Sequence, residues 1–299
     1  MTRQRGKRLA GFWCLCFVLG SAWVLGLAHS AAPVTLRSLG CESVVLCIAF
    51  GVLGRRELTF ATRSTWMSLG LWGSVLAFPA VLSAGANVAL SSITLTLIFT
   101  LVPVATVLAA TQKEVRFGPD EGRMQLMVPA IAGIGGSALL LPFALPEDIS
   151  AQIWFALALV SAALTGIALV RLHALLENAG LWAASSIVCA GWAIVCGGFS
   201  WLNPFNAQHA WKEVFLFGAS QICLIAVLIV LTLWLLQRWS PTQVSARYLA
   251  VPLVTIVEGA GLLRPEISWT MGLGLALLAV SVMLLTREQT ADSADALPE

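Results

Sequence analysis

The feature of this sequence that most limits its fold is a series of ten apolar runs, separated by short polar or proline-containing breaks. A run of about 20 apolar residues, wound as a helix, crosses a bilayer core of roughly 30 Å. Because backbone groups must bond to one another inside the bilayer, the runs predict transmembrane helices. The first run follows a basic stretch and also has features of a signal peptide, but its length favours a span. The runs lie near residues 9–29, 34–53, 66–84, 88–111, 126–145, 151–172, 181–201, 214–237, 242–263 and 267–286.

Composition rules out a soluble protein with a single membrane anchor. The chain has 299 residues, of which 59% are hydrophobic and 11% are charged. An ordinary soluble domain carries roughly a quarter charged residues, enough to cover its surface. The mean hydropathy of +0.88 is an average over the whole chain, so the apolar character is distributed along it. The composition therefore predicts an all-α, multi-pass membrane protein, which we expect in the cell membrane (plasma or inner membrane), in contact with the lipid bilayer.

The positions of the basic residues predict the orientation of the chain. When the loops are assigned alternately to two sides, thirteen of the 17 lysines and arginines fall on the side of the N-terminus. The other side receives only Lys212 and Arg264, while Arg37 and Arg247 lie within spans. Since cytoplasmic loops of membrane proteins are enriched in lysine and arginine, both termini are expected in the cytoplasm.

Ten spans divide into two sets of five, and because five is odd, the second set must enter the membrane from the opposite side. We therefore expect one five-helix repeat in residues 1–146, an inverted second repeat in 147–287, and a disordered cytoplasmic tail in 288–299. A short echo supports the duplication, because Val102-Pro103-Val104-Ala105-Thr106 recurs as Val251-Pro252-Leu253-Val254-Thr255. Pro103 and Pro252 are candidate hinges, since a proline removes a helix hydrogen bond. Alternatively, they are prolines that a membrane helix tolerates and that have no role in function.

Several short motifs occur at matching places in the two halves. The first half has Ala32-Pro33 before Arg37, then Ala89-Leu90 and Leu101-Val102-Pro103 leading toward Glu114. The second half has Arg247-Tyr248-Leu249-Ala250-Val251-Pro252-Leu253, Gly259, Gly261, Pro265-Glu266 and Gly272-Leu273-Gly274. With these motifs the chain resembles the EamA-type branch of the drug/metabolite transporter superfamily, although Trp23 and Glu258 depart from its usual pattern. The resemblance implies a ten-helix inverted repeat, a central cavity, alternating access, and export or uptake of metabolites, amino acids or drugs.

Four ionisable side chains lie inside predicted spans and are candidates for substrate binding or coupling: Arg37, Glu42, Arg247 and Glu258. Each costs about 2.5–3.5 kcal/mol to insert at the centre of a span, so it needs a function or a partner. Glu42 and Glu258 are expected at similar depths, where they could share one cavity and bind an amine or a proton. Alternatively the glutamates form interhelical ion pairs, and the arginines extend toward the lipid headgroups.

Polar and aromatic residues add weaker candidates. Asn87 and Thr94 lie in or beside the fourth span, and Tyr248 accompanies Arg247 in the ninth. Trp23 lies deep in the first span, and with Trp72, Trp192 and Trp234 it could line an apolar cavity. Seven further tryptophans near span ends fit an interfacial aromatic belt: Trp13, Trp66, Trp154, Trp201, Trp211, Trp239 and Trp269.

The function expected from these features is transport of a small molecule by alternating access, and not catalysis. Export is one direction that this transport could take. The chain contains no HExxH or GxSxG motif and no CxxC pair, so neither a metal site, a cofactor nor nucleic-acid binding is expected. The alternative is a membrane-embedded lipid-modifying enzyme, which would need a catalytic constellation near a membrane face. The substrate, the direction, the coupling ion and the oligomeric state are left open.

Overall fold

The computed structural model is almost entirely helical across the residues that it describes, and no strand occurs within them. These residues are 2–28, 36–57, 62–86, 92–113, 121–140, 148–202, 210–263 and 268–287. The expected disordered tail, 288–299, lies outside them. The helices are α1 (Thr2–Ala28), α2 (Leu36–Leu53), α3 (Arg63–Val75), α4 (Phe78–Ala86), α5 (Ser92–Phe99), α6 (Val102–Lys113), α7 (Glu121–Leu140), α8 (Ile149–Leu176), α9 (Leu181–Leu202), α10 (Ala210–Leu236), α11 (Pro241–Ser245), α12 (Arg247–Leu263) and α13 (Trp269–Thr286).

Every apolar run of the sequence coincides with one helix or with two consecutive helices. The third, fourth and ninth runs are the divided ones, formed by α3 with α4, α5 with α6, and α11 with α12. Two of these interruptions are followed by a proline, since Pro79 and Pro103 are each the second residue of the helix after the break. Before Pro103 the backbone tightens, and the N–H of Leu101 donates to the carbonyl of Ile98 at 3.0 Å. A proline has no N–H and its ring crowds the preceding turn, so the helix is interrupted there.

The interruption of the ninth run does not lie at its proline. The α11–α12 break is at Ala246, whereas Pro252 lies within α12, which continues on both sides of it. The short α11 begins at a capping box in which the Ser240 side chain accepts from the N–H of Gln243 and the Gln243 side chain accepts from the N–H of Ser240. Pro103 therefore marks a helix break, and Pro252 does not.

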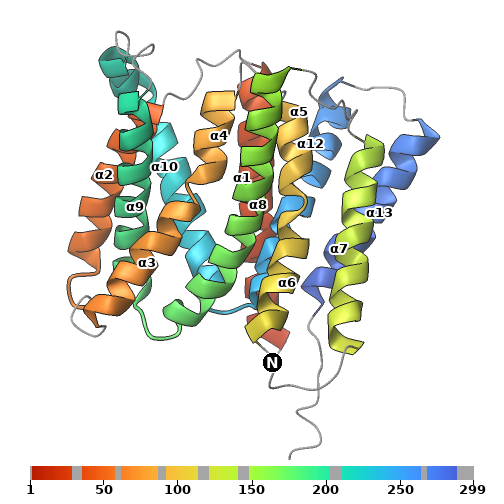
Figure 1. Cartoon of the computed structure of the whole chain (residues 1–299), viewed down its shortest axis with the longest axis horizontal. Coiled ribbons are helices and arrows are strands. Elements are labelled where there is room, and N and C mark those ends of the chain that lie inside the picture. The colour runs from red at the N-terminus through yellow and green to blue at the C-terminus, as the bar shows by residue number, and fades with distance from the viewer. Residues whose placement is uncertain are drawn as a thin grey trace, which may run out of the picture.

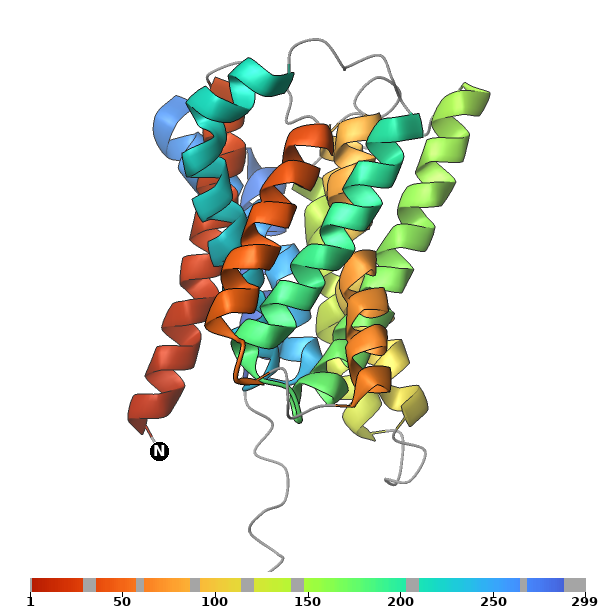
Figure 2. The ribbon, with the colours of Figure 1, turned by 90° about the vertical axis from the view of Figure 1, so that its left-hand side faces the viewer.

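The helices stand side by side in one bundle, with α2 and α9 at one edge and α7 and α13 at the other (Figure 1). Figure 2 looks onto the edge formed by α2 and α9. Between the edges, α1 packs against α10 and α12, while α8 packs against α3 and α6. Further contacts join α3 to α9 and α2 to α10. Segments from the two halves of the chain are thus in contact throughout the bundle.

Small residues allow the closest of these contacts. A Cβ atom added to Gly136 of α7 would lie 2.9 Å from the carbonyl oxygen of Gly274 in α13. One added to Gly166 of α8 would lie 2.7 Å from the Cβ of Ala105 in α6. Both distances are shorter than a normal contact, so the backbones can approach this closely only without a side chain, as in other membrane helix pairs.

The outer surface of the bundle is apolar. Many large hydrophobic side chains are exposed on it, including Val45, Ile48 and Val52 of α2 and Ile194 of α9. Within the described residues, five helical segments are long and apolar enough to cross a membrane: Arg63–Leu82, Ile93–Thr111, Ile149–Leu176, Leu181–Trp201 and Trp269–Thr286. Three shorter apolar helices accompany them: Ser38–Leu53, Gln125–Leu140 and Ile222–Leu236. A soluble protein rarely exposes so continuous an apolar surface, and the chain is an all-α membrane protein.

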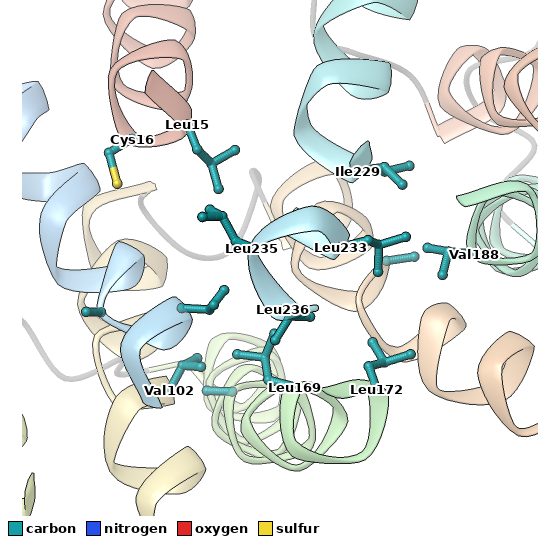
Figure 3. Packing of buried hydrophobic residues seen from close by; sticks show 14 of the residues in the cluster. Leu15, Cys16, Val102, Leu169, Leu172, Val188, Ile229, Leu233, Leu235 and Leu236 are labelled. Carbon is teal, nitrogen blue, oxygen red and sulfur yellow. The ribbon is translucent and has the colours of Figure 1, made fainter. Parts of the chain in front are cut away.

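One end of the bundle is tightly filled. Leu15 of α1, Leu169 and Leu172 of α8, and Leu235 and Leu236 of α10 are each at most 1% exposed. Leu235 points toward Leu15, and Leu236 points toward Leu169 (Figure 3). We call these five residues the leucine cluster. Leu15 lies midway along α1, whereas the other four lie in the C-terminal parts of α8 and α10, so the cluster extends toward the end of the bundle that carries the N-terminus (Figure 1).

The basic residues gather at this same end of the bundle. They lie in or near the first turns of α1 and α3 and the last turns of α2, α8, α10 and α13, which all point the same way in Figure 1. Apart from Arg247, which begins α12, the basic residues that the structure describes with their side chains are Lys7, Arg8, Arg55, Arg56, Arg63, Arg171, Arg238 and Arg287.

Candidate functional site

A cavity of about 350 Å³ lies between helices from both halves of the chain. From the first half, it is lined by α1, α5 and the α3–α4 segment. From the second half, it is lined by α9, α10 and α12. The lining residues are Leu19, Leu76, Pro79, Ala80, Leu95, Thr96, Phe99, Val188, Trp192, Leu228, Ile229, Thr232, Leu233, Arg247, Tyr248, Val251 and Pro252. Its size is at the lower end of the range typical of small-molecule sites, about 300–1,000 Å³.

The wall of the cavity is mostly aliphatic and aromatic, with a few polar groups on it. Among the described lining residues, Thr96, Thr232 and Tyr248 supply hydroxyl groups, and Arg247 is the only charged side chain. These residues include no carboxylate, imidazole or thiol. Among the described residues of the whole chain, no group of three or more metal-ligating side chains occurs. The groups on this wall suit binding of a partly apolar molecule, and they do not form a nucleophile with a base.

Arg247 is the central polar group of the site. It begins α12, directly after the break at Ala246, and is only 6% exposed. Its guanidinium donates hydrogen bonds to the Oγ1 of Thr232 and, at 3.0 Å, to the hydroxyl of Tyr248. The interpretation that Arg247 extends to the lipid headgroups is therefore wrong, because its charged end lies inside the bundle.

The aromatic ring of Tyr248 also contacts the guanidinium. The Arg247 guanidinium carbon lies 4.9 Å from the centroid of the Tyr248 ring, within the range of a cation–π contact. The other neighbour of that ring is Phe99 of α5, with the two ring centroids 6.4 Å apart. These contacts connect α12 of the second half to α5 of the first half across the cavity.

The two glutamates lie elsewhere, and neither lines this cavity. Glu42 of α2 is 1% exposed, and neither carboxyl oxygen has a hydrogen-bond partner among the described residues. Its helix packs against α9 and α10. Glu258 of α12 is half-buried and accepts a hydrogen bond from the hydroxyl of Ser21 at 2.9 Å. The structure thus does not bring them together in the cavity that we expected them to share.

The remaining sequence candidates are divided between the cavity and other places. Tyr248 and Pro252 line the cavity, whereas Thr94 is buried outside it. Pro103 lies at the α5–α6 break. Three candidates cannot be placed: Asn87 lies outside the described residues, and so do the side chains of Arg37 and Trp23.

The tryptophans follow the sequence interpretation only in part. Trp201 and Trp269, at the ends of α9 and α13, are 91% and 95% exposed, as expected of an interfacial belt. Trp192 lines the cavity, as considered for the deeper tryptophans. Trp239, which we assigned to the belt, is 5% exposed and its ring packs 5.5 Å from that of Phe12. That assignment is wrong, because a position near a helix end does not decide which side of the helix faces lipid.

Sequence reasoning missed two contributors to the site. Pro79 interrupts the third run inside the cavity wall, and Thr232 supplies a hydroxyl group. Pro79 had a usable signal, a proline in the middle of an apolar run. Thr232 had none, because a threonine in a span usually bonds to its own backbone.

Comparisons with known proteins find the same fold in a solved structure, but they name no function. No protein-family model matches the chain, and no curated protein matches it. One solved structure, described simply as "Crystal structure of protein", is similar over 94% of this chain and 98% of its own. The TM-score is 0.67 and the sequence identity is 17%. The bundle is therefore a fold found among experimentally determined structures.

Proposed function

We propose that this chain is a small-molecule transporter of the drug/metabolite type, and that its cavity is the substrate site. The observation that carries the proposal is the position of the cavity, which is lined by helices from both halves of the chain. In alternating-access transporters, substrates bind near the midplane between structural repeats. The proposal includes the EamA-type fold that the sequence motifs resemble, a location in the cell membrane, and the absence of an enzymatic activity.

The pattern of helix contacts supports two inverted five-helix repeats, 1–146 and 147–287. Exchange of the halves would replace α1 by α8, α2 by α9, α3–α4 by α10, α5–α6 by α11–α12, and α7 by α13. Under this exchange the contact of α6 with α8 becomes that of α12 with α1. Likewise α3 with α9 becomes α10 with α2, while the α2–α9 and α7–α13 pairs are unchanged. A repeat packed about a twofold axis predicts contacts of this kind.

The distribution of charge and packing supports an orientation and a conformational state. The end with the basic residues is cytoplasmic in this proposal, because cytoplasmic loops carry an excess of lysine and arginine. The leucine cluster lies between the cavity and that end, since Leu235 and Leu236 follow the cavity-lining Leu233 along α10. Access from the cytoplasm would then require the cluster to separate, and the breaks at Ala246 and before Pro103 are places where helices can bend.

The experiment is flux through the purified full-length chain in proteoliposomes, screened across metabolite classes with and without a proton gradient. Leu228→Trp adds bulk on the cavity wall, whereas Val227→Trp adds the same ring on the exposed side of α10. We expect Leu228→Trp to lower the flux of any transported compound at least tenfold and Val227→Trp to lower it less than twofold. Equal flux for the two variants would show that the cavity is not on the transport route.

The same preparation separates transport from the enzymatic alternative. A lipid-modifying enzyme would change the composition of the liposomes without net movement of a solute. Mass spectrometry of the lipids after incubation measures this directly. Conversion of lipid, together with no flux across the whole panel, would replace the transporter proposal.

A further inference from the structure

We infer that the cavity binds an amphipathic anion, a small molecule with a carboxylate or similar oxyanion on an apolar body, and that Arg247 binds the anionic group. The inference concerns the same cavity as the proposed function and rests on it for the step of transport. The preferred charge of the ligand is opposite to that of the amine which Glu42 and Glu258 suggested in the sequence.

The first argument is the charge of the cavity wall. An arginine side chain stays protonated in proteins, so Arg247 brings a permanent positive charge into the wall. Both of its described partners are neutral, the hydroxyl groups of Thr232 and Tyr248. None of the described side chains that line the cavity carries a negative charge. Among the side chains that the structure describes, Glu42 and Glu258 lie elsewhere, and Glu258 accepts from Ser21.

The second argument is the cost of that arrangement. A buried charge is expensive unless it is paired as well as hydrogen-bonded. The two hydroxyl partners satisfy part of the guanidinium, but they supply no opposite charge. An anion that enters the cavity would provide it. The binding of a negatively charged ligand is thereby favoured over that of a neutral or positively charged ligand of the same shape.

The third argument is the geometry of the donors. A guanidinium has five N–H groups, two on each terminal nitrogen and one on Nε. Arg247 uses one N–H of Nη1 toward Thr232 and one of Nη2 toward Tyr248, which leaves one on each terminal nitrogen. Two donors on a planar fork suit the two oxygens of a carboxylate. The contacts with Thr232 and Tyr248 fix the position of the fork before the ligand arrives.

The rest of the wall specifies the other part of the ligand. Beyond Arg247 and the hydroxyl groups, the described lining is made of leucine, isoleucine, valine, alanine, proline, phenylalanine and tryptophan side chains. Burial of apolar ligand surface against them contributes about 25 cal/mol per Å². A fully hydrophilic anion, such as inorganic phosphate, would lose its hydration without this compensation. The cavity therefore favours an anion with an apolar body.

The test is equilibrium binding to the purified full-length chain, measured by a thermal shift and by competition with one radiolabelled probe. Two matched series separate charge from shape: phenylacetate, phenethylamine and 2-phenylethanol, and octanoate, octylamine and octanol. We expect each carboxylate to bind at least tenfold more tightly than the amine and the alcohol of its series. This part needs no variant, so it does not depend on the folding of a mutant.

Variants then assign the anion site. Arg247→Gln should weaken carboxylate binding at least tenfold, and Arg247→Lys should weaken it less. Tyr248→Phe should weaken it severalfold, because the guanidinium loses the hydroxyl that positions it. Arg238→Gln is the control, since Arg238 is exposed outside the cavity, with its guanidinium 4.6 Å from the Trp234 ring. It should leave binding unchanged.

The outcomes keep the inference distinct from the proposed function. Failure of every carboxylate to bind, equally tight binding of an amine or alcohol, or undiminished binding by folded Arg247→Gln would each overturn the anion site. Flux of amines or alcohols that is blocked by Leu228→Trp would leave the transporter proposal intact while removing this inference. Carboxylate binding that needs Arg247, without flux in proteoliposomes, would support the anion site and remove the transporter proposal.

Discussion

Successive turns of α10 lie in two different surroundings. Leu228 and Thr232 line the cavity, whereas Leu235 and Leu236 are fully buried in the leucine cluster. The side chains around both regions are mostly aliphatic, so composition does not distinguish them. In the cluster, α1 and α8 fill the space beside α10 (Figure 3). Around the cavity the same bundle leaves a volume of about 350 Å³ open. Packing, and not residue type, therefore determines where this bundle is closed and where it holds a site.

The largest expected effect tests whether the two regions differ in packing energy. Leu236→Ala should lower the free energy of unfolding by about 2–5 kcal/mol, because a fully buried leucine leaves a void in a filled core. Leu228→Ala should cost clearly less, because its side chain already borders open volume and has fewer atoms to lose contact with. Denaturation of both variants in the same detergent, followed by circular dichroism, measures the difference. Equal losses would mean that the cavity wall is as tightly packed as the cluster.

A second effect concerns how closely α6 and α8 approach each other at Gly166. Gly166→Ala should cost about 1–3 kcal/mol by overpacking, because the added methyl would lie 2.7 Å from the Cβ of Ala105 and 2.8 Å from the backbone nitrogen of Thr106. Gly135→Ala, whose added methyl meets nothing within 4 Å, is the matched control. Midpoints of thermal unfolding compare them. A stable Gly166→Ala variant would show that α6 and α8 can separate here at little cost.

The sequence predicted most of the fold, because the bilayer itself imposes the main constraint. Each apolar run of sufficient length became a helix or a pair of helices, since backbone groups in lipid have no other partners. A bend was predicted at both Pro103 and Pro252 from the missing N–H, and the structure interrupts the helix before Pro103 but not at Pro252. The break at Ala246 was not predicted, because no proline causes it and it depends on how α11 and α12 pack in the bundle.

The candidate site was predicted only where local sequence determines position. Arg247 and Tyr248 were found because a charge inside an apolar run is unusual. Their partners were not, because Thr232 and Phe99 come close only when distant helices pack. Glu42 and Glu258 were expected in one cavity from their similar depth. Depth along a helix axis does not decide the direction in which a side chain points, and the structure places both outside the cavity.

The smallest expected effect concerns Glu42, a polar group buried in neither of the two compared regions. Glu42→Gln preserves the shape of the side chain and removes a carboxyl whose oxygens have no described hydrogen-bond partner. A charge buried without a partner is destabilising, and an amide avoids that cost. We expect the free energy of unfolding to stay equal or to rise by up to about 1 kcal/mol, within the usual size of a single hydrogen-bonding change.

The readout must separate this local effect from the cavity. Binding of phenylacetate to Glu42→Gln should stay within twofold of the unmodified chain, because Glu42 does not line the site that holds Arg247. A loss of stability well beyond 1 kcal/mol, as a rough scale, would instead indicate that the carboxylate is paired with a cation. In that case a charge pair at α2 would stabilise the edge of the bundle. Glu42 would then be a structural charge, in contrast to Arg247 of the cavity, whose charge would bind the ligand.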